Sequence, residues 1–83
     1  MLRREIWIDG EGRVARYSLG YINHLIYSGD NGRVLGYDSA HGIHHRHFMG
    51  KTVGVTFKRF ERIEARFQQE WSRLVKESTR GKD

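Results

Sequence analysis

Apolar and polar residues alternate along the first part of the chain, which is the pattern of half-buried β-strands. Ile6 and Ile8 alternate with Glu5, Trp7 and Asp9 and predict a short first strand. A second segment carries apolar side chains at every other position on one face, namely Ala15, Tyr17, Leu19 and Tyr21. Since side chains of a strand point alternately to opposite faces, this segment predicts a strand with one buried face.

The clearest turn signal is Asn31-Gly32. Asn-Gly readily adopts the two positive φ angles of a type I′ hairpin turn. We therefore predict that residues 34–37 return antiparallel against residues 25–27. Residues 38–51 are mostly polar and are expected to form a loop, and residues 52–57 are expected to form a final short edge strand.

From Phe60 onward the apolar residues follow a helical period. They form the stripe of an amphipathic helix with charged residues on its other side, at Phe60, Ile63, Phe67, Trp71 and Leu74. Strands followed by one helix indicate an α+β fold, with a small antiparallel sheet of about four strands in hairpins and the C-terminal amphipathic helix packed on it. We expect residues 1–83 to form a single domain, with residues 79–83 as a frayed tail.

Composition narrows the class of protein. The 83 residues contain no cysteine, so disulfides and thiolate metal sites are excluded. No apolar run approaches the roughly 20 residues that span a membrane, and no apolar segment follows the basic N-terminal residues. These features lead us to expect a cytoplasmic protein. Because so short a chain has a thin core and exposed sheet edges, a homodimer is a further expectation.

The net charge of +5 comes mostly from arginine, which supplies 11 of the 15 basic residues. The planar guanidinium suits bidentate contacts with phosphate. An arginine-rich basic domain therefore favours RNA or another phosphate-bearing or acidic partner. The candidate nucleic-acid contacts in strands and turns are Arg13, Arg16, Arg33 and Lys51.

Residues 37–47 contain four of the five histidines in the chain. Imidazole titrates near neutral pH, so it can act as a general base or a general acid. Histidines, a guanidinium and a carboxylate together suit metal-free cleavage of a phosphodiester, since base, acid and stabilising cation are all present. This hypothesis requires no cofactor, and its candidate catalytic residues are Tyr37, Asp38, His41, His44, His45, Arg46 and His47.

Three other interpretations of this segment remain open. Two or three imidazoles could bind zinc, nickel or copper with Asp38 as an oxygen ligand, although the spacing matches no recognised zinc motif. His44 and His47 could be structural, bonding to backbone at the end of the sheet. The segment could also be a binding loop in which the histidines and Arg46 contact phosphate without catalysis.

The same segment resembles the TumE-like family of small bacterial toxins from toxin–antitoxin systems. The likeness covers roughly residues 14–75, and its most specific part is the His-His-Arg-His run at 44–47 after Tyr37-Asp38. Gly36 replaces the basic residue expected before Tyr-Asp, and Ser39 replaces the usual asparagine. The resemblance implies a toxin that is neutralised by a helix-turn-helix antitoxin. RNA cleavage is an expectation from the residue chemistry and from analogy with other small toxins.

Overall fold

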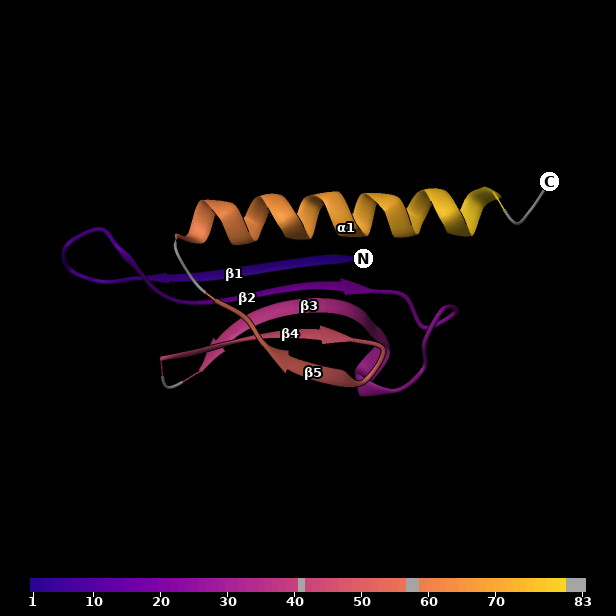
Figure 1. Cartoon of the computed structure of the whole chain (residues 1–83), viewed down its shortest axis with the longest axis horizontal. Helices are drawn as coiled ribbons and strands as arrows, with labels where there is room; N and C mark the ends of the chain where they lie inside the picture. The colour runs from indigo at the N-terminus through magenta and orange to yellow at the C-terminus, as the bar shows by residue number, and fades with distance from the viewer. Residues whose placement is uncertain (41, 57–58, 81–83) are drawn as a thin grey trace.

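The chain folds into one antiparallel sheet with a single long helix along one side of it (Figure 1). The computed structural model describes residues 1–40, 42–56 and 59–80. The strands follow one another in the sheet in chain order, which makes a meander. Their bounds are Leu2–Ile8 for β1, Val14–Ile22 for β2, Arg33–Ala40 for β3, Ile43–Phe48 for β4 and Lys51–Gly54 for β5, and the helix α1 spans Phe60–Arg80.

Short turns connect β1 with β2 and β4 with β5. Between β1 and β2, Asp9 Oδ1 accepts hydrogen bonds from the backbone N–H groups of Glu11 and Arg13, at 2.9 and 3.0 Å. Between β4 and β5, Met49 and Gly50 both have positive φ, at 46° and 83°. Two positive φ angles in a two-residue connection are the requirement of a type I′ hairpin, so this turn fixes the pairing of β4 with β5.

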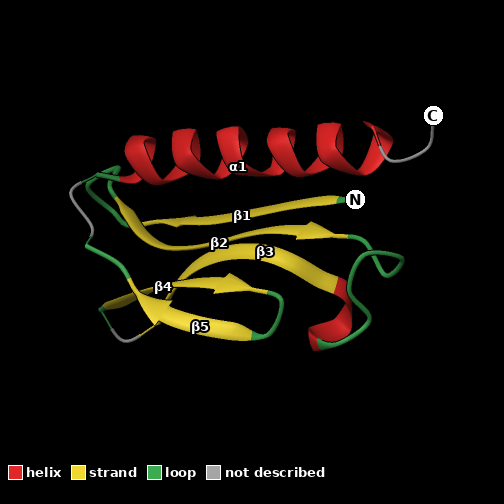
Figure 2. Cartoon of the chain, turned by 45° about the vertical axis from the view of Figure 1, so that its right-hand side comes forward, coloured by secondary structure: helices red, strands yellow, loops and turns green. Residues whose placement is uncertain are grey.

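The core lies between the sheet and α1. The helix runs roughly along the strands and covers one face only (Figure 2). The apolar stripe predicted for the helix is confirmed at Phe60, Ile63 and Phe67, which are at most 8% exposed. They pack on alternate residues of the central strands, namely Tyr17, Leu19, Tyr21, Leu35 and Tyr37. The α+β fold predicted from the sequence is therefore confirmed, with five strands.

The predicted hairpin at Asn31-Gly32 is wrong. Asn31 and Gly32 do have positive φ, but so does Asp30, and the three residues form a short turn that leads directly into β3. The backbone N–H of Asn23 bonds to Gly32 O at 2.8 Å, which closes residues 23–32 into a loop. Consequently β3 pairs with β2, and residues 25–27 form no strand.

The prediction of a loop over residues 38–51 is also wrong. β3 continues to Ala40, and residues 43–48 form the whole of β4. The last strand, β5, begins at Lys51 and ends at Gly54, so it is shorter than the strand predicted over residues 52–57. Phe57 of that prediction lies outside the described residues. The predicted tail overlaps α1 at Thr79 and Arg80, and residues 81–83 are not described. In the part of the chain that the structure describes, no helix is long and apolar enough to cross a membrane.

Candidate functional site

The pairing of β3 with β4 sorts the predicted site residues onto two faces of the sheet. Asp38 is opposite His45 and Gly36 is opposite His47, while Tyr37 is opposite Arg46. Since directly paired residues share a face and consecutive residues alternate, the sheet separates two sets. Asp38, His45 and His47 lie on the face away from α1, which we call the open face. Tyr37, His44 and Arg46 lie on the face that α1 covers.

On the open face the carboxylate of Asp38 is surrounded by three nitrogen-bearing side chains. His47 Nε2 lies 2.9 Å from Asp38 Oδ2, and His45 Nδ1 lies 3.7 Å from Oδ1. Arg33 Nη1 lies 3.4 Å from Oδ2. The rings of His45 and His47 are 6.1 Å apart between centroids. We call these four residues the Asp38 cluster.

The two imidazoles of the Asp38 cluster differ in accessibility. The His47 side chain is 15% exposed, with Nδ1 3.0 Å from Thr52 Oγ1 and Nε2 buried against Asp38. That Nε2 contact is short but is not a hydrogen bond. The His45 side chain is 31% exposed, and only its Nδ1 is directed at the carboxylate. His45 is therefore the imidazole that a substrate can reach, and His47 holds Asp38 in place.

Gly36 explains how Arg33 reaches the Asp38 cluster. A Cβ atom at Gly36 would lie 2.8 Å from Arg33 Cδ and 3.1 Å from the backbone oxygen of Leu19. The side chain of Arg33 thus crosses the space that any other residue at position 36 would fill. Asp30 also holds this guanidinium, at 2.8 Å from its Nε. The basic group that the family resemblance led us to expect at position 36 is absent, and Arg33 brings a guanidinium to the same part of the face.

On the covered face, Glu70 of α1 joins the helix to the sheet. Its carboxylate accepts hydrogen bonds from the hydroxyl of Tyr37 and from Arg46, whose Nε lies 3.1 Å from Oε2. Burial raises the pKa of the Glu70 carboxyl, but the bonds from Arg46 and Tyr37 and the charges of Arg46 and Arg66 outweigh it, and the net pKa is lowered. Burial and the bond to Glu70 raise the pKa of Tyr37. The charged residues of the helix were expected on the side away from its apolar stripe, and Glu70 departs from this because it bonds to two residues of the sheet.

His44 also has its contacts on the covered face. Its ring stacks on the buried Tyr17, and its Nδ1 lies 3.0 Å from the hydroxyl of Tyr17. Burial raises the pKa of Tyr17 to about 12, with a further contribution from the negative charge of Asp38. Burial, and then the neighbouring His45, lower the pKa of His44. Both shifts favour a neutral phenol and a neutral imidazole that are hydrogen-bonded to each other, which is a packing role.

Replacing Glu70 with glutamine is expected to lower the free energy of unfolding at pH 7 by about 1–3 kcal/mol, because the half-buried Arg46 loses its counter-charge and its charged acceptor. The wild-type carboxyl has a pKa below its usual 4.5. Its contribution is therefore fully present above that value and is lost as pH falls through the folded pKa. Chemical denaturation of both proteins should show a difference that is constant near neutral pH and shrinks below pH 4.5.

The matched control is Glu64→Gln, also on α1. Glu64 bonds to Arg4 at the β1 side of the helix, where the Arg4 side chain is 61% exposed. Such a pair contributes little in water, so this variant should unfold like the wild type. Equal losses for the two variants would contradict the role given to Glu70.

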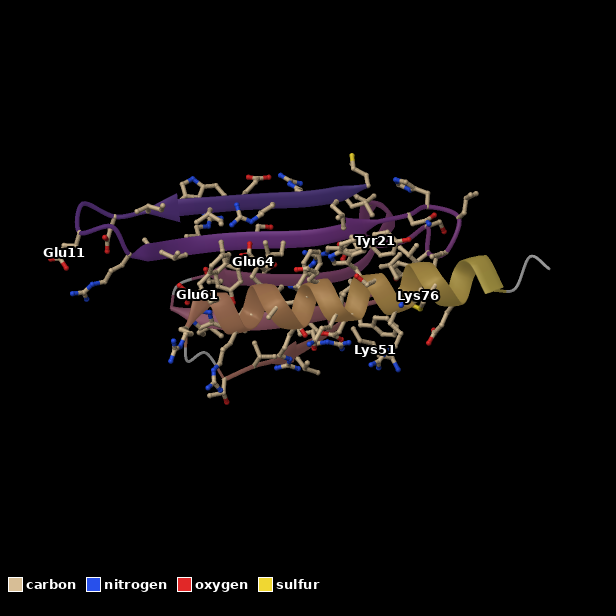
Figure 3. All side chains as sticks on the ribbon, turned by 90° about the horizontal axis from the view of Figure 1, so that it is seen from above. Glu11, Tyr21, Lys51, Glu61, Glu64 and Lys76 are labelled. Atoms are coloured by element: carbon tan, nitrogen blue, oxygen red, sulfur yellow. The ribbon has the colours of Figure 1, made fainter. Side chains whose placement is uncertain are left out.

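The remaining predicted residues lie outside the Asp38 cluster. Arg16 is on the open face of β2, with its guanidinium carbon 5.0 Å from the centroid of the Trp7 ring. Arg13 pairs with Glu11 at 3.0 Å in the β1–β2 turn, and Figure 3 shows Glu11 beyond the start of the helix. Lys51 is exposed at the start of β5, and its partner in the pairing is Phe48 of the covered face. His41 lies outside the described residues.

Sequence reasoning missed two supporting groups, Thr52 and Glu70. Thr52 is directly opposite His47 in the sheet, and a correct register of β4 with β5 would have identified it.

Ser39, which replaces the asparagine of the resemblance, is buried and its Oγ accepts a hydrogen bond from the backbone N–H of Tyr17 at 3.1 Å. No group of three or more His, Asp or Glu side chains among the described residues is arranged to hold a metal ion.

Comparison with known protein families, with curated proteins and with solved structures finds no match to this chain. The chemistry of the open face therefore has to be inferred from its own side chains.

Proposed function

We propose that this protein is a metal-independent RNA endonuclease and the toxin of a bacterial toxin–antitoxin system. The Asp38 cluster on the uncovered face is the observation that supports the proposal. It places an accessible imidazole and a guanidinium beside one carboxylate, with His45 Nδ1 3.7 Å and Arg33 Nη1 3.4 Å from oxygens of Asp38. General acid–base catalysis with electrostatic stabilisation of a phosphorane requires these groups and no metal ion.

In the proposed reaction, His45 acts as the general base. Its imidazole takes the proton of a ribose 2′-hydroxyl, and the 2′-oxygen forms a bond to the adjacent phosphorus. The bond from phosphorus to the 5′-oxygen breaks, and that oxygen takes a proton from water. The hydroxide that remains takes the proton from the His45 imidazolium, which restores the base. The products are a 2′,3′-cyclic phosphate and a 5′-hydroxyl, so atoms and protons balance.

Each remaining member of the Asp38 cluster has a distinct part in this reaction. The Asp38 carboxylate, 3.7 Å from Nδ1 of His45, leaves Nε2 for the substrate and stabilises the imidazolium that forms. His47 fixes the opposite oxygen of Asp38 and is a positioning residue. Arg33 donates to the phosphate oxygens as negative charge develops. Because Arg33 also faces Asp30, it stays oriented before the substrate binds.

The toxin assignment rests on the resemblance to TumE-like proteins together with this site. It implies a cytoplasmic protein and a cognate helix-turn-helix antitoxin that blocks the open face or its approach. Binding without cleavage is the second candidate function, supported by the net charge of +5. A homodimer remains a prediction.

Purified protein is expected to cleave RNA in the presence of EDTA, because the Asp38 cluster supplies the acid–base and electrostatic groups itself. Mass spectrometry of the fragments should find 2′,3′-cyclic phosphate and 5′-hydroxyl ends. A substrate with 2′-O-methyl riboses is the matched control and should remain intact, since it has no 2′-hydroxyl to deprotonate. Activity abolished by EDTA and restored by a divalent metal would contradict the mechanism, and binding of intact RNA would favour the second candidate.

A further inference from the structure

The open face consists of three rows of side chains that cross the strands. Direct pairing defines them. The first row is Trp7 and Arg16; the second is Glu5, Ser18, Asp38, His45 and Gly54; the third is Arg3, Gly20, Gly36, His47 and Thr52. The Asp38 cluster occupies the middle of the second and third rows. Trp7 and Arg16 are therefore the neighbouring row on the same face.

Small residues leave the middle of this face low. Ser18 and Gly20 of β2 have small or no side chains, whereas the Arg33 side chain crosses the space over Gly36. With about 4.8 Å between neighbouring strands, the interval from β1 to β4 is roughly 14 Å. A cavity of about 210 Å³ opens over Gly20, lined by Arg3, Ser18 and Arg33 among others. The open face is thus a shallow trough, with the Asp38 cluster along one side.

Trp7 lies on β1 in the first row of the open face and is not among the residues that line this cavity. Its side chain is 43% exposed, although tryptophan is usually largely buried. The Arg16 guanidinium lies over the indole at 5.0 Å, so the two planar groups form one cationic, aromatic surface. An unpaired nucleobase stacks well on such a surface, and stacking contributes about 1–3 kcal/mol per base.

We propose that Trp7 and Arg16 form a base-stacking subsite for single-stranded RNA, a proposal that rests on the proposed function of the Asp38 cluster. Trp7 is two strands and two residues from Asp38, which corresponds to roughly 12 Å. One short RNA strand spans this distance, with a phosphate at the Asp38 cluster and a nearby base on Trp7. Ser18 is the β2 residue directly beside Asp38 in the second row, and its small side chain leaves room for the intervening backbone.

The two tryptophans of the chain allow a direct test. Trp71 is on α1 and packs against the core on the covered face. The variant Trp71→Phe therefore leaves Trp7 as the reporter of the open face, and Trp7→Phe leaves Trp71 as the matched control. The probe is a short single-stranded oligonucleotide with 2′-O-methyl riboses, which cannot be cleaved, and a terminal dye reports its binding by anisotropy.

Saturation with this probe is expected to quench the emission of Trp7 in Trp71→Phe and to leave the emission of Trp71 in Trp7→Phe unchanged. The variant Trp7→Ala should raise the Kd about 5- to 150-fold, and Trp71→Phe should leave it unchanged. Circular dichroism shows whether Trp7→Ala is folded, and the quenching measurement does not depend on that variant.

The subsite is refuted if the probe binds by anisotropy while Trp7 emission does not change and Trp7→Ala binds like the wild type. Absence of any binding also refutes it. Failure of the proposed function has a different signature, since the wild type would then leave unmodified RNA intact while the probe still quenched Trp7.

Discussion

Replacing His45 with glutamine is expected to reduce RNA cleavage by about 10²- to 10⁴-fold, the usual effect of losing a general base. Glutamine keeps a polar side chain of similar reach beside Asp38 but cannot take a proton at neutral pH. His45 is 31% exposed on the open face, so the fold should tolerate the change. The measurement is the initial rate of RNA cleavage together with the thermal unfolding midpoint, and expression in bacteria should no longer arrest growth.

The adjacent residue supplies the control. His44 is next to His45 in β4 but faces the other way and contacts Tyr17. The variant His44→Gln should therefore cleave RNA at the wild-type rate, with any effect limited to stability. If His44→Gln loses activity while folded and His45→Gln keeps it, the catalytic face has been assigned to the wrong side of the sheet. Full activity in both would show that the segment is not catalytic.

Removing the guanidinium from the Asp38 cluster is the second change with a large expected effect. The variant Arg33→Met should lower kcat about 10²- to 10³-fold, as expected when one preorganised donor to a developing negative charge is lost. Gly36→Ala should act through the same group, because its Cβ would overlap Arg33 Cδ at 2.8 Å. The measurement is kcat for both single variants and for the double variant. The kcat of the double variant should be close to that of Arg33→Met alone, because two changes that act on one interaction are not additive.

Arg13→Met is the matched control for this pair, because it removes the same charge at the β1–β2 turn, where Arg13 is 78% exposed beside Glu11. It should leave kcat unchanged. Additive losses from Arg33→Met and Gly36→Ala would mean that Gly36 acts by another route, such as the contact with the backbone of Leu19. A loss in Arg13→Met equal to that in Arg33→Met would indicate that net charge, and not position, is responsible.

The overall fold was predictable because its strongest signals are periodic. The helical stripe from Phe60 to Phe67 and the alternation from Tyr17 to Tyr21 both bury the residues that their periods select. The wrong predictions of the fold concern turns. Asn31-Gly32 supplies positive φ angles, but Asp30 shares them, and the sequence does not reveal that Asn23 closes the loop. The actual type I′ turn contains Met49, for which positive φ is unusual.

The candidate site was only half predictable. The crowding of histidines marked the right segment, but its polarity suggested a loop, whereas residues 43–48 are a strand. Once the segment is a strand, alternation separates His44 from His45, and only the pairing with β3 shows that His45 is beside Asp38. Arg33 was expected as a phosphate contact. Its side chain reaches the Asp38 cluster through the space over Gly36, and this path is visible only in the folded sheet.

The division of β3 and β4 between two faces has a consequence for how this protein can diverge. Every second residue in these strands packs in the core, and the residues between them carry the chemistry. Point substitutions on the open face can therefore change specificity without altering the core residues that stabilise the fold. A one-residue insertion in either strand would exchange the two sets, placing charged groups beneath the helix and aromatic rings in water. Variation in length should therefore be confined to the connections, above all to residues 23–32, whereas the strands should vary only in identity.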